Sequence, residues 1–215
     1  MNSNREDYLK VIYEEGGVKD TVSNRVISEK LNIKASSVTE MLVKLNELEF
    51  IEYIPYKGSR LTEQGLKACM VVCRKHRIWE VFLTKCLGYS WREAHEQAHI
   101  MEHVTDDLMI ERLDKFLNFP EVCPHGEYIP RDNITELKNN KAYRLCDLKE
   151  QEEAKITGIL EEGDLLDYVE EQGLKIGEGV MVISKGKYEG AITLRQGEVQ
   201  IIISHKAATQ IYVDK

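Results

Sequence analysis

Apolar residues recur at helical spacing in three stretches near the start of the chain, and each stretch predicts a helix. They cover residues 4–15, 23–31 and 35–51, and Ser23 stands where a helix N-cap is expected. Only three residues separate the second helix from the third, which begins with small and polar side chains. Two helices joined by so short a turn are typical of a helix-turn-helix motif.

Residues 51–62 follow a different pattern, in which apolar and polar residues alternate around a turn at Lys57 and Gly58. Such alternation on both sides of a glycine turn predicts a β-hairpin. A hairpin placed directly after a helix-turn-helix is typical of the wing in a winged helix. We therefore expect a winged-helix domain over residues 1–65.

Helical periodicity then returns and predicts three more helices. One is opened by Thr62, one by Ser90, and one covers residues 105–117. Three of the four Pro residues fall in the loop that follows, at 119–130. Because proline ends helical structure, we place a domain boundary after this loop and expect a helical domain over residues 66–130.

The remaining residues, 131–215, change in character. Short β-rich runs are separated by glycine turns and interrupted by one short helix at residues 163–173. Several short strands in about 80 residues are typical of a small barrel. The expected fold class is therefore mainly α with β: a winged helix-turn-helix, a helical domain and a small C-terminal β-barrel.

The composition is that of an ordinary globular protein, 42% hydrophobic and 31% charged over 215 residues. No run approaches the roughly 18 continuous apolar residues of a transmembrane helix, and the N-terminus lacks the apolar region of a secretory signal. Five Cys at irregular spacing fit a reducing compartment. The net charge of −8 argues against a protein that coats nucleic acid non-specifically, although a local DNA-reading face is compatible with it. We expect a cytoplasmic protein with no membrane partner.

Residues able to bind a metal ion gather on one face of two predicted helices and in the proline-rich loop. Side chains three, four, seven or eight residues apart share a helix face. The candidate ligands are His76, Glu80, His95, His99, Glu102, His103, Cys123 and His125, which Asp7 would join if the first helix packs nearby. This mixture of oxygen, nitrogen and sulfur donors suits a first-row transition ion. Cys69 and Cys73 share the stripe of His76 and Glu80, but we expect them to be small core residues.

Residues 95–99 read HEQAH and match the H-E-x-x-H pattern of zinc proteases, in which two His hold the metal and the Glu is the general base. The extended form of that pattern needs Gly and His where this chain has Glu102 and Thr105. A distant Glu could supply the third ligand, but a helix-turn-helix and a wing have no role in a protease. We therefore interpret the pattern as a metal-binding helix with Glu96 on a solvated face, and we expect no enzyme activity.

The third helix carries side chains suited to reading DNA on the side away from its apolar stripe. Serine hydroxyls can bond phosphates or base edges, Glu40 can accept a hydrogen bond from a cytosine amino group, and Val43 can contact a thymine methyl group. Basic side chains on either side suit phosphates. The predicted DNA contacts are Lys34, Ser36, Ser37, Thr39, Glu40, Val43, Lys44, Lys57 and Arg60. The same residues would also form an ordinary solvated helix face.

In this order the elements resemble the diphtheria toxin repressor family of metal-dependent repressors, especially its manganese-responsive branch. The resemblance covers essentially the whole chain. It is carried by EDYLKVIYE, SSVTEMLVKL, RKHRIWEVFL, HEQAHIMEHV with ERLDKFLNFP, CPHG-x-x-IP and the β-rich C-terminal module. The resemblance implies a homodimeric repressor with an SH3-like C-terminal domain, which binds palindromic operator DNA when it holds Mn(II) or Fe(II).

The resemblance also implies two metal sites in each chain. By position, one site would use Asp7, His99, Glu102 and His103. The other would use His76, Glu80 and His95, or Glu80 with Cys123 and His125. Glu161 and Asp164 stand where the C-terminal domain of family members can add ligands.

Two positions depart from the family pattern. His99 replaces the usual Cys or carboxylate, which keeps a ligand but changes its charge and softness. Lys10 stands where some manganese sensors have a second carboxylate, which disfavours a binuclear site there. Asp7 is a hard ligand that favours Mn(II) or Fe(II), whereas the soft Cys123 would also accept Zn(II) or Co(II). We expect Mn(II) as co-repressor, Fe(II) as the other candidate, and Zn(II) or Co(II) as substitutes.

These observations favour a metal-dependent transcriptional repressor that controls metal-uptake genes. Its partners would be double-stranded operator DNA and a second copy of the chain, with no small-molecule substrate. A metal-storage or metal-delivery protein is the alternative, and the helix-turn-helix with its wing argues against it.

Overall fold

The computed structural model describes residues 3–131 and 143–215, so the part of the predicted C-terminal domain at 132–142 lies outside the described residues. The chain divides into two compact units. The first takes in the residues up to Lys75 and one turn of a later helix, Met101–Thr105, and the second takes in most of the rest.

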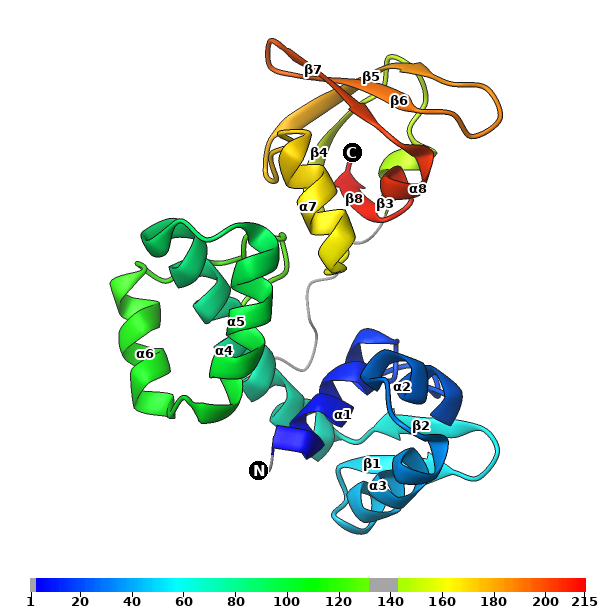
Figure 1. The fold of residues 1–215 in the computed structure, drawn as a ribbon, viewed down its shortest axis with the longest axis vertical. Coiled ribbons are helices and arrows are strands. Elements are labelled where there is room, and N and C mark those ends of the chain that lie inside the picture. The colour runs from blue at the N-terminus through cyan, green and yellow to red at the C-terminus, as the bar shows by residue number, and fades with distance from the viewer. Residues whose placement is uncertain (1–2, 132–142) are drawn as a thin grey trace. The chain divides into compact units, whose positions relative to one another are not determined.

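The first unit contains the winged helix that the sequence predicts (Figure 1). Its elements are α1 (Ser3–Glu14), α2 (Asn24–Leu31), α3 (Ala35–Glu47), β1 (Ile51–Ile54), β2 (Gly58–Leu61) and the opening turns of α4 (Glu63–Leu87). The apolar stripes of the helices form one core, in which Leu9, Ile27 and Leu42 are fully buried. Ser23 caps α2 as expected, because its side chain accepts a hydrogen bond from the Val26 N–H.

Helix α3 ends four residues earlier than its apolar periodicity predicts, at Glu47 rather than residue 51. Glu49 adopts a left-handed φ of 61°, and its N–H donates to the carbonyl of Asn46. The chain therefore turns before it enters β1. The sequence pattern predicts a longer helix because Leu48 continues the apolar spacing of α3. In the structure Leu48 lies at the end of the helix and is 40% exposed, so it does not extend the buried face.

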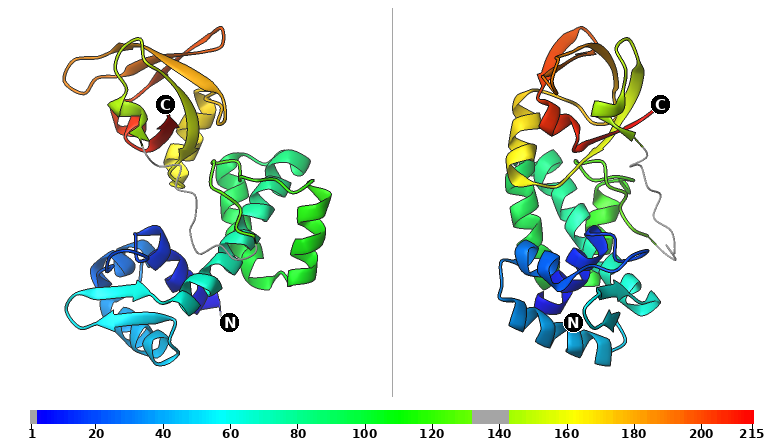
Figure 2. Two further views of the ribbon diagram at one scale, coloured as in Figure 1. Left: turned by 180° about the vertical axis from the view of Figure 1, so that it is seen from behind. Right: turned by 90° about the vertical axis from the view of Figure 1, so that its right-hand side faces the viewer.

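The wing is fixed to the segment before α2 at its glycine turn. Val22 and Ser59 exchange two backbone hydrogen bonds, of 2.8 and 2.9 Å. Gly58 has a φ of 127°, and a Cβ atom there would lie 2.2 Å from the Val22 carbonyl oxygen. Glycine is therefore required at this position for the hairpin to approach so closely. Figure 2 shows the hairpin from two further sides.

Two further helices follow α4. They are α5 (Trp91–Val104) and α6 (Asp107–Phe116). Ser90 and Glu93 form a reciprocal cap at the start of α5, with hydrogen bonds of 3.3 and 3.0 Å. Asp106 caps α6, because its side chain accepts a hydrogen bond from the Met109 N–H. None of the helices in the described residues combines the length and the hydrophobicity needed to cross a membrane.

The C-terminal part forms one antiparallel sheet with the strand order β3-β8-β4-β5-β6-β7. In chain order the elements are β3 (Tyr143–Arg144), η1 (Leu145–Asp147), β4 (Glu153–Ile159), α7 (Gly163–Glu171), β5 (Gly179–Lys185), β6 (Ile192–Gln196), β7 (Val199–Ile203), α8 (His205–Ala208) and β8 (Ile211–Asp214). Register shifts in β4 and β5 bend the sheet, whose inner face carries a buried apolar core. This agrees with the small barrel that the sequence predicts. Helix α8 was not predicted, because four residues are too few to show a period.

Candidate metal centres

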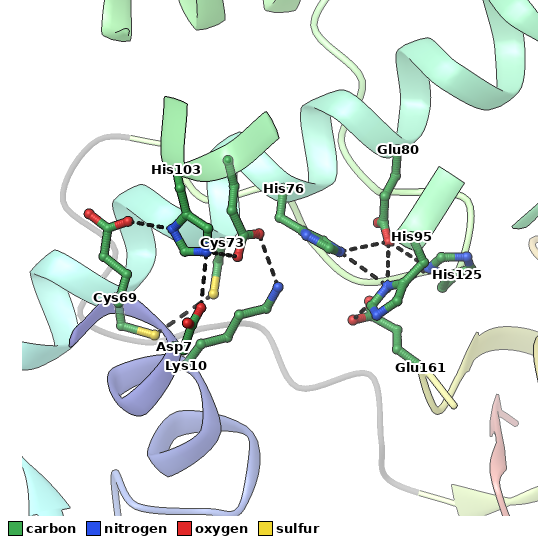
Figure 3. A network of polar contacts seen from close by, with 12 residues as sticks. Asp7, Lys10, Cys69, Cys73, His76, Glu80, His95, His103, His125 and Glu161 are labelled. Atoms are coloured by element: carbon green, nitrogen blue, oxygen red, sulfur yellow. Dashed lines mark hydrogen bonds and ion pairs between the residues drawn. The ribbon is translucent and has the colours of Figure 1, made fainter. Parts of the chain in front are cut away.

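The first candidate cluster joins α1 to the last turn of α5. Asp7, Glu102 and His103 offer ligand atoms that lie within 4.8 Å of one another. The Nε2 atom of His103 lies 2.9 Å from Asp7 Oδ1 (Figure 3) and 3.4 Å from Glu102 Oε1. Within the described residues Asp7 Oδ1 is buried and accepts no hydrogen bond. Two carboxylates facing one imidazole nitrogen make a hard donor set, which suits Mn(II) or Fe(II).

Two other side chains of α1 orient this cluster. Glu6 Oε2 accepts a hydrogen bond of 2.7 Å from Nδ1 of His103, which leaves Nε2 as the nitrogen that faces Asp7. The ammonium group of Lys10 donates to Oε2 of the buried Glu102 at 3.1 Å. Glu6 is not predicted from the sequence, because a carboxylate beside Asp7 on a helix gives no signal of its own.

His99 lies one turn before His103 on α5, and its side chain is exposed. Spacings of three and four residues place it on the same helix face as Glu102 and His103. This helix therefore presents a third nitrogen or oxygen donor on that face.

The second candidate cluster lies within the second unit and brings together six side chains from four segments (Figure 3). They are His76 and Glu80 of α4, His95 of α5, Cys123 and His125 of the loop after α6, and Glu161 after β4. The Oε1 atom of Glu80 lies 2.9 Å from His76 Nε2, 3.0 Å from His95 Nδ1 and 3.2 Å from His125 Nδ1. Glu161 lies 3.7 Å from His125 Nδ1 and 4.0 Å from His95 Nδ1. Ligand-type side chains that are far apart in the sequence thus meet around one carboxylate.

This second cluster is largely shielded from water, and burial and charge shift its pKa values. Burial by itself raises the pKa of Glu80, but the neighbouring His125 and His76 lower it well below its ordinary value. Burial is the largest single effect on His125 and lowers its pKa, but the charge of Glu80 and the contacts with Cys123 and Glu161 together raise that pKa well above its ordinary value. Burial raises the pKa of the Cys123 thiol to about 12, so a metal ion that binds this sulfur must displace its proton.

Four atoms of the second cluster are buried without a hydrogen bond to any described residue. They are Glu80 Oε2, both ring nitrogens of His125 and Glu161 Oε1. Buried polar atoms are nearly always satisfied in folded proteins, so four together in one cluster need an explanation. Metal coordination would satisfy them, and these donor types are ones that transition ions bind.

The loop that carries Cys123 and His125 is held against β4. The Ile159 N–H donates to the His125 carbonyl at 3.0 Å. Gly126 has a φ of 88°, and a Cβ atom there would lie 2.0 Å from the carbonyl oxygen of Thr157. The close approach of this loop to β4 therefore depends on glycine.

Asp164 lies apart from the second cluster, unlike the expectation that the resemblance gave. Its carboxylate accepts a hydrogen bond of 3.2 Å from Arg92, and its side chain is fully exposed. Arg92 reaches it from α5 and also donates to Asp167 at 2.8 Å and to Glu96 at 3.1 Å. In this structure Asp164 is an ion-pair partner of Arg92 and belongs to none of the candidate ligand sets among the described residues.

The two His of the H-E-x-x-H match do not share one candidate metal site among the described residues. His95 belongs to the second cluster, whereas His99 faces the side of Glu102 and His103. Glu96, the would-be general base, is exposed and paired with Arg92, as expected of a solvated face.

All nine predicted DNA-contacting residues are exposed, at the N-cap of α3, on α3 itself or on the wing. They are Lys34, Ser36, Ser37, Thr39, Glu40, Val43, Lys44, Lys57 and Arg60. The Thr39 hydroxyl is engaged within the domain, since it donates to the Ala35 carbonyl at 3.0 Å and accepts from Asn24 at 3.1 Å. Arg60 is held by Glu52 at 2.7 Å. These two side chains are therefore less available to DNA than their neighbours.

Three family models match consecutive parts of the chain. The iron dependent repressor N-terminal DNA binding domain matches residues 1–59, the iron dependent repressor metal binding and dimerisation domain matches 62–131, and the FeoA domain matches 143–215.

Individual proteins match as well. An uncharacterised HTH-type transcriptional regulator of Methanocaldococcus jannaschii is 36% identical over 120 residues, which are 54% of this chain and 94% of that protein. The structure of the manganese regulator SloR is 36% identical with a TM-score of 0.79 and covers 100% of both chains. A manganese-dependent transcriptional repressor in complex with manganese is 27% identical with a TM-score of 0.86, over 98% of this chain and 99% of that one.

Proposed function

Because this chain belongs to the diphtheria toxin repressor family, in its manganese-responsive branch, we propose that it binds palindromic operator DNA when it holds Mn(II) and so represses metal-uptake genes. The family is one of metal-dependent transcriptional repressors, not of enzymes. The family, the fold class with its SH3-like C-terminal domain, and the general function predicted from the sequence are confirmed.

The observation that carries the proposal is the presence of two ligand clusters on a winged-helix chain. Each cluster draws its donors from separate segments, so an ion bound there would tie those segments together. In the first cluster these are α1 of the winged helix and the last turn of α5. Metal binding would therefore act directly on a helix of the DNA-binding domain.

We assign the metal ligands as follows. Asp7, His99, Glu102 and His103 would hold the first ion, and His76, Glu80, His95, Cys123, His125 and Glu161 would form the second centre. The oxygen-rich first set favours Mn(II), with Fe(II) as the nearest substitute. The Cys123 sulfur would also bind Zn(II) or Co(II).

We further propose three domains and two partners. The domains are the DNA-binding domain at 1–65, the dimerisation and metal-binding domain at 66–130 and the C-terminal domain at 131–215. The partners are operator DNA and a second copy of the chain, which meet in the cytoplasm. A dimer would present two recognition helices to half-sites about one helical turn apart, roughly 34 Å.

The mechanism requires that the ion prefer the DNA-competent conformation. A ligand shifts a conformational equilibrium only by its difference in affinity for the two states. Glu6 and Lys10 hold His103 and Glu102 in place from α1, so this helix and the ligands of α5 are already in register in the structure. A metal ion would stabilise that arrangement by adding Asp7 to the same contact.

Selection of genomic fragments by the purified protein tests the proposal. The selection is run with Mn(II) and again after chelation, with protein shown to be folded and metal-loaded. We expect a palindromic sequence to be enriched only with metal. Absence of enrichment in both conditions would favour metal storage or delivery instead.

The exposed face of α3 gives a second prediction. Glu40→Ala is expected to change base preference at one operator position, because a direct contact to a base edge discriminates by about 1–3 kcal/mol. Lys44→Ala is expected to weaken binding to all sequences alike, since a phosphate contact carries no base information. Binding to a library of operator variants measures both, with Lys67→Ala as the control for an exposed lysine. Unchanged preference at every position in Glu40→Ala would refute the assignment.

A further inference from the structure

We propose that the second cluster binds two metal ions that share Glu80 and Glu161, so that a fully loaded chain holds three ions. This inference rests on the proposed function, because it takes the cluster to be a metal centre. The six side chains divide into two overlapping sets of four. One set is His76, Glu80, His95 and Glu161, and the other is Glu80, Cys123, His125 and Glu161.

Each set of four side chains has enough donors to bind one metal ion. The four ligand atoms of each lie within 4.8 Å of one another. Two bonds of about 2.0–2.3 Å at a tetrahedral angle place their ligand atoms roughly 3.3–3.8 Å apart, so either set can close around an ion if its side chains move by about 1 Å. Four protein donors are also the number that a closed tetrahedral site uses.

One ion does not account for all six donors. In the described residues no single group within that distance contains all six, and the two sets differ in their remaining pairs of donors. His76 and His95 lie 3.1 Å apart by their nearest ring nitrogens. The other pair, Cys123 and His125, comes from one loop. An ion held by either pair leaves the other pair unused.

Glu80 has the features of a bridging carboxylate. Its Oε1 atom faces three imidazoles, whereas its Oε2 atom is buried and accepts no hydrogen bond from the described residues. Glu161 likewise reaches both sides, since one of its oxygens lies 3.7 Å from His125 Nδ1 and the other lies 4.0 Å from His95 Nδ1. Carboxylates placed between two ligand pairs are typical of two-metal sites, where the ions lie about 3.5–4 Å apart.

The charges are compatible with two ions. Two carboxylates and the Cys123 thiolate, formed when a metal displaces the thiol proton, give three negative charges against four positive ones. The single net positive charge lies at a cluster with a solvent-facing edge, since the side chains of His95 and Glu161 are 26% and 17% exposed. Water and solvent anions can reach that edge.

Titration with Co(II) tests the proposal, because a thiolate bound to Co(II) absorbs in the near ultraviolet and reports Cys123 separately from the total metal count. The full chain carrying His103→Ala isolates the second cluster. We expect two Co(II) ions per chain in this background and three in the wild type. His95→Ala should remove one ion and keep the thiolate band, whereas Cys123→Ser should remove one ion and the band.

His205→Ala and Cys146→Ser serve as matched controls, since neither residue belongs to a cluster. Binding of one ion in the His103→Ala background, with both cluster variants weakening that same ion, would overturn the two-ion inference and leave the repressor proposal intact. Binding of no ion by the wild type would overturn both. The electron paramagnetic resonance of wild-type protein loaded with Mn(II) needs no cluster variant: a carboxylate-bridged pair should show spin coupling, and isolated ions alone would contradict the inference.

Discussion

Glu102→Gln is expected to abolish the metal-dependent part of DNA binding while the protein stays folded. Glu102 is buried between two partners, with Oε1 facing His103 and Oε2 accepting from Lys10. Glutamine keeps the shape and an acceptor for Lys10 but removes the negative charge that would bind a dication. Coupling between ligand sites typically changes affinity about 5- to 150-fold, so the operator affinity with Mn(II) should fall by about this factor to that of metal-free protein.

Fluorescence anisotropy with operator DNA, with and without Mn(II), measures this effect. Glu96→Gln is the matched control, because Glu96 lies exposed on the same helix and outside both clusters. His103→Ala should behave like Glu102→Gln. A normal metal response in both variants would exclude the first cluster as the sensor.

Glu80→Gln is expected to destabilise the metal-free protein in a pH-dependent way. The depressed pKa of Glu80 stabilises the fold above the ordinary value of 4.5 for a glutamate, and the raised pKa of His125 stabilises it below the ordinary value of 6.5 for a histidine. Both contributions are present together between these two values. Removing one member of a buried ion pair costs about 3–5 kcal/mol, and we expect a loss of that order at pH 6.

Urea unfolding with a chelator present, at pH 6 and at higher pH, measures this loss. The difference between wild type and Glu80→Gln should shrink as the pH rises through the raised pKa of His125, because a neutral imidazole no longer needs the anion. Glu96→Gln should leave the free energy of unfolding nearly unchanged at both pH values. A difference that does not depend on pH would show that Glu80 contributes by packing and not by charge.

Metal should increase the difference in the free energy of unfolding between the wild type and Glu80→Gln. An ion at 100 times its dissociation constant stabilises the folded state by about 2.7 kcal/mol. The wild type can gain this at the second cluster, whereas Glu80→Gln lacks the carboxylate that both ligand sets share.

The sequence by itself determined the local features of this protein. The 3.6-residue period located the helices, and the alternation around Gly58 located the wing, because both patterns depend only on neighbours along the chain. The same period placed His76 with Glu80, and Glu102 with His103, on shared helix faces. The order of these elements was sufficient for the family resemblance.

Only the tertiary structure decided which of the candidate ligands on different helices and loops lie together. Glu161 reaches the cluster around Glu80, while the nearby Asp164 turns to Arg92, and no spacing in the sequence distinguishes these two carboxylates. Glu6 was missed for the same reason, since its partner His103 lies 97 residues away in the chain. Contacts between distant segments depend on how helices, loops and strands pack, and that packing leaves no periodic trace in the sequence.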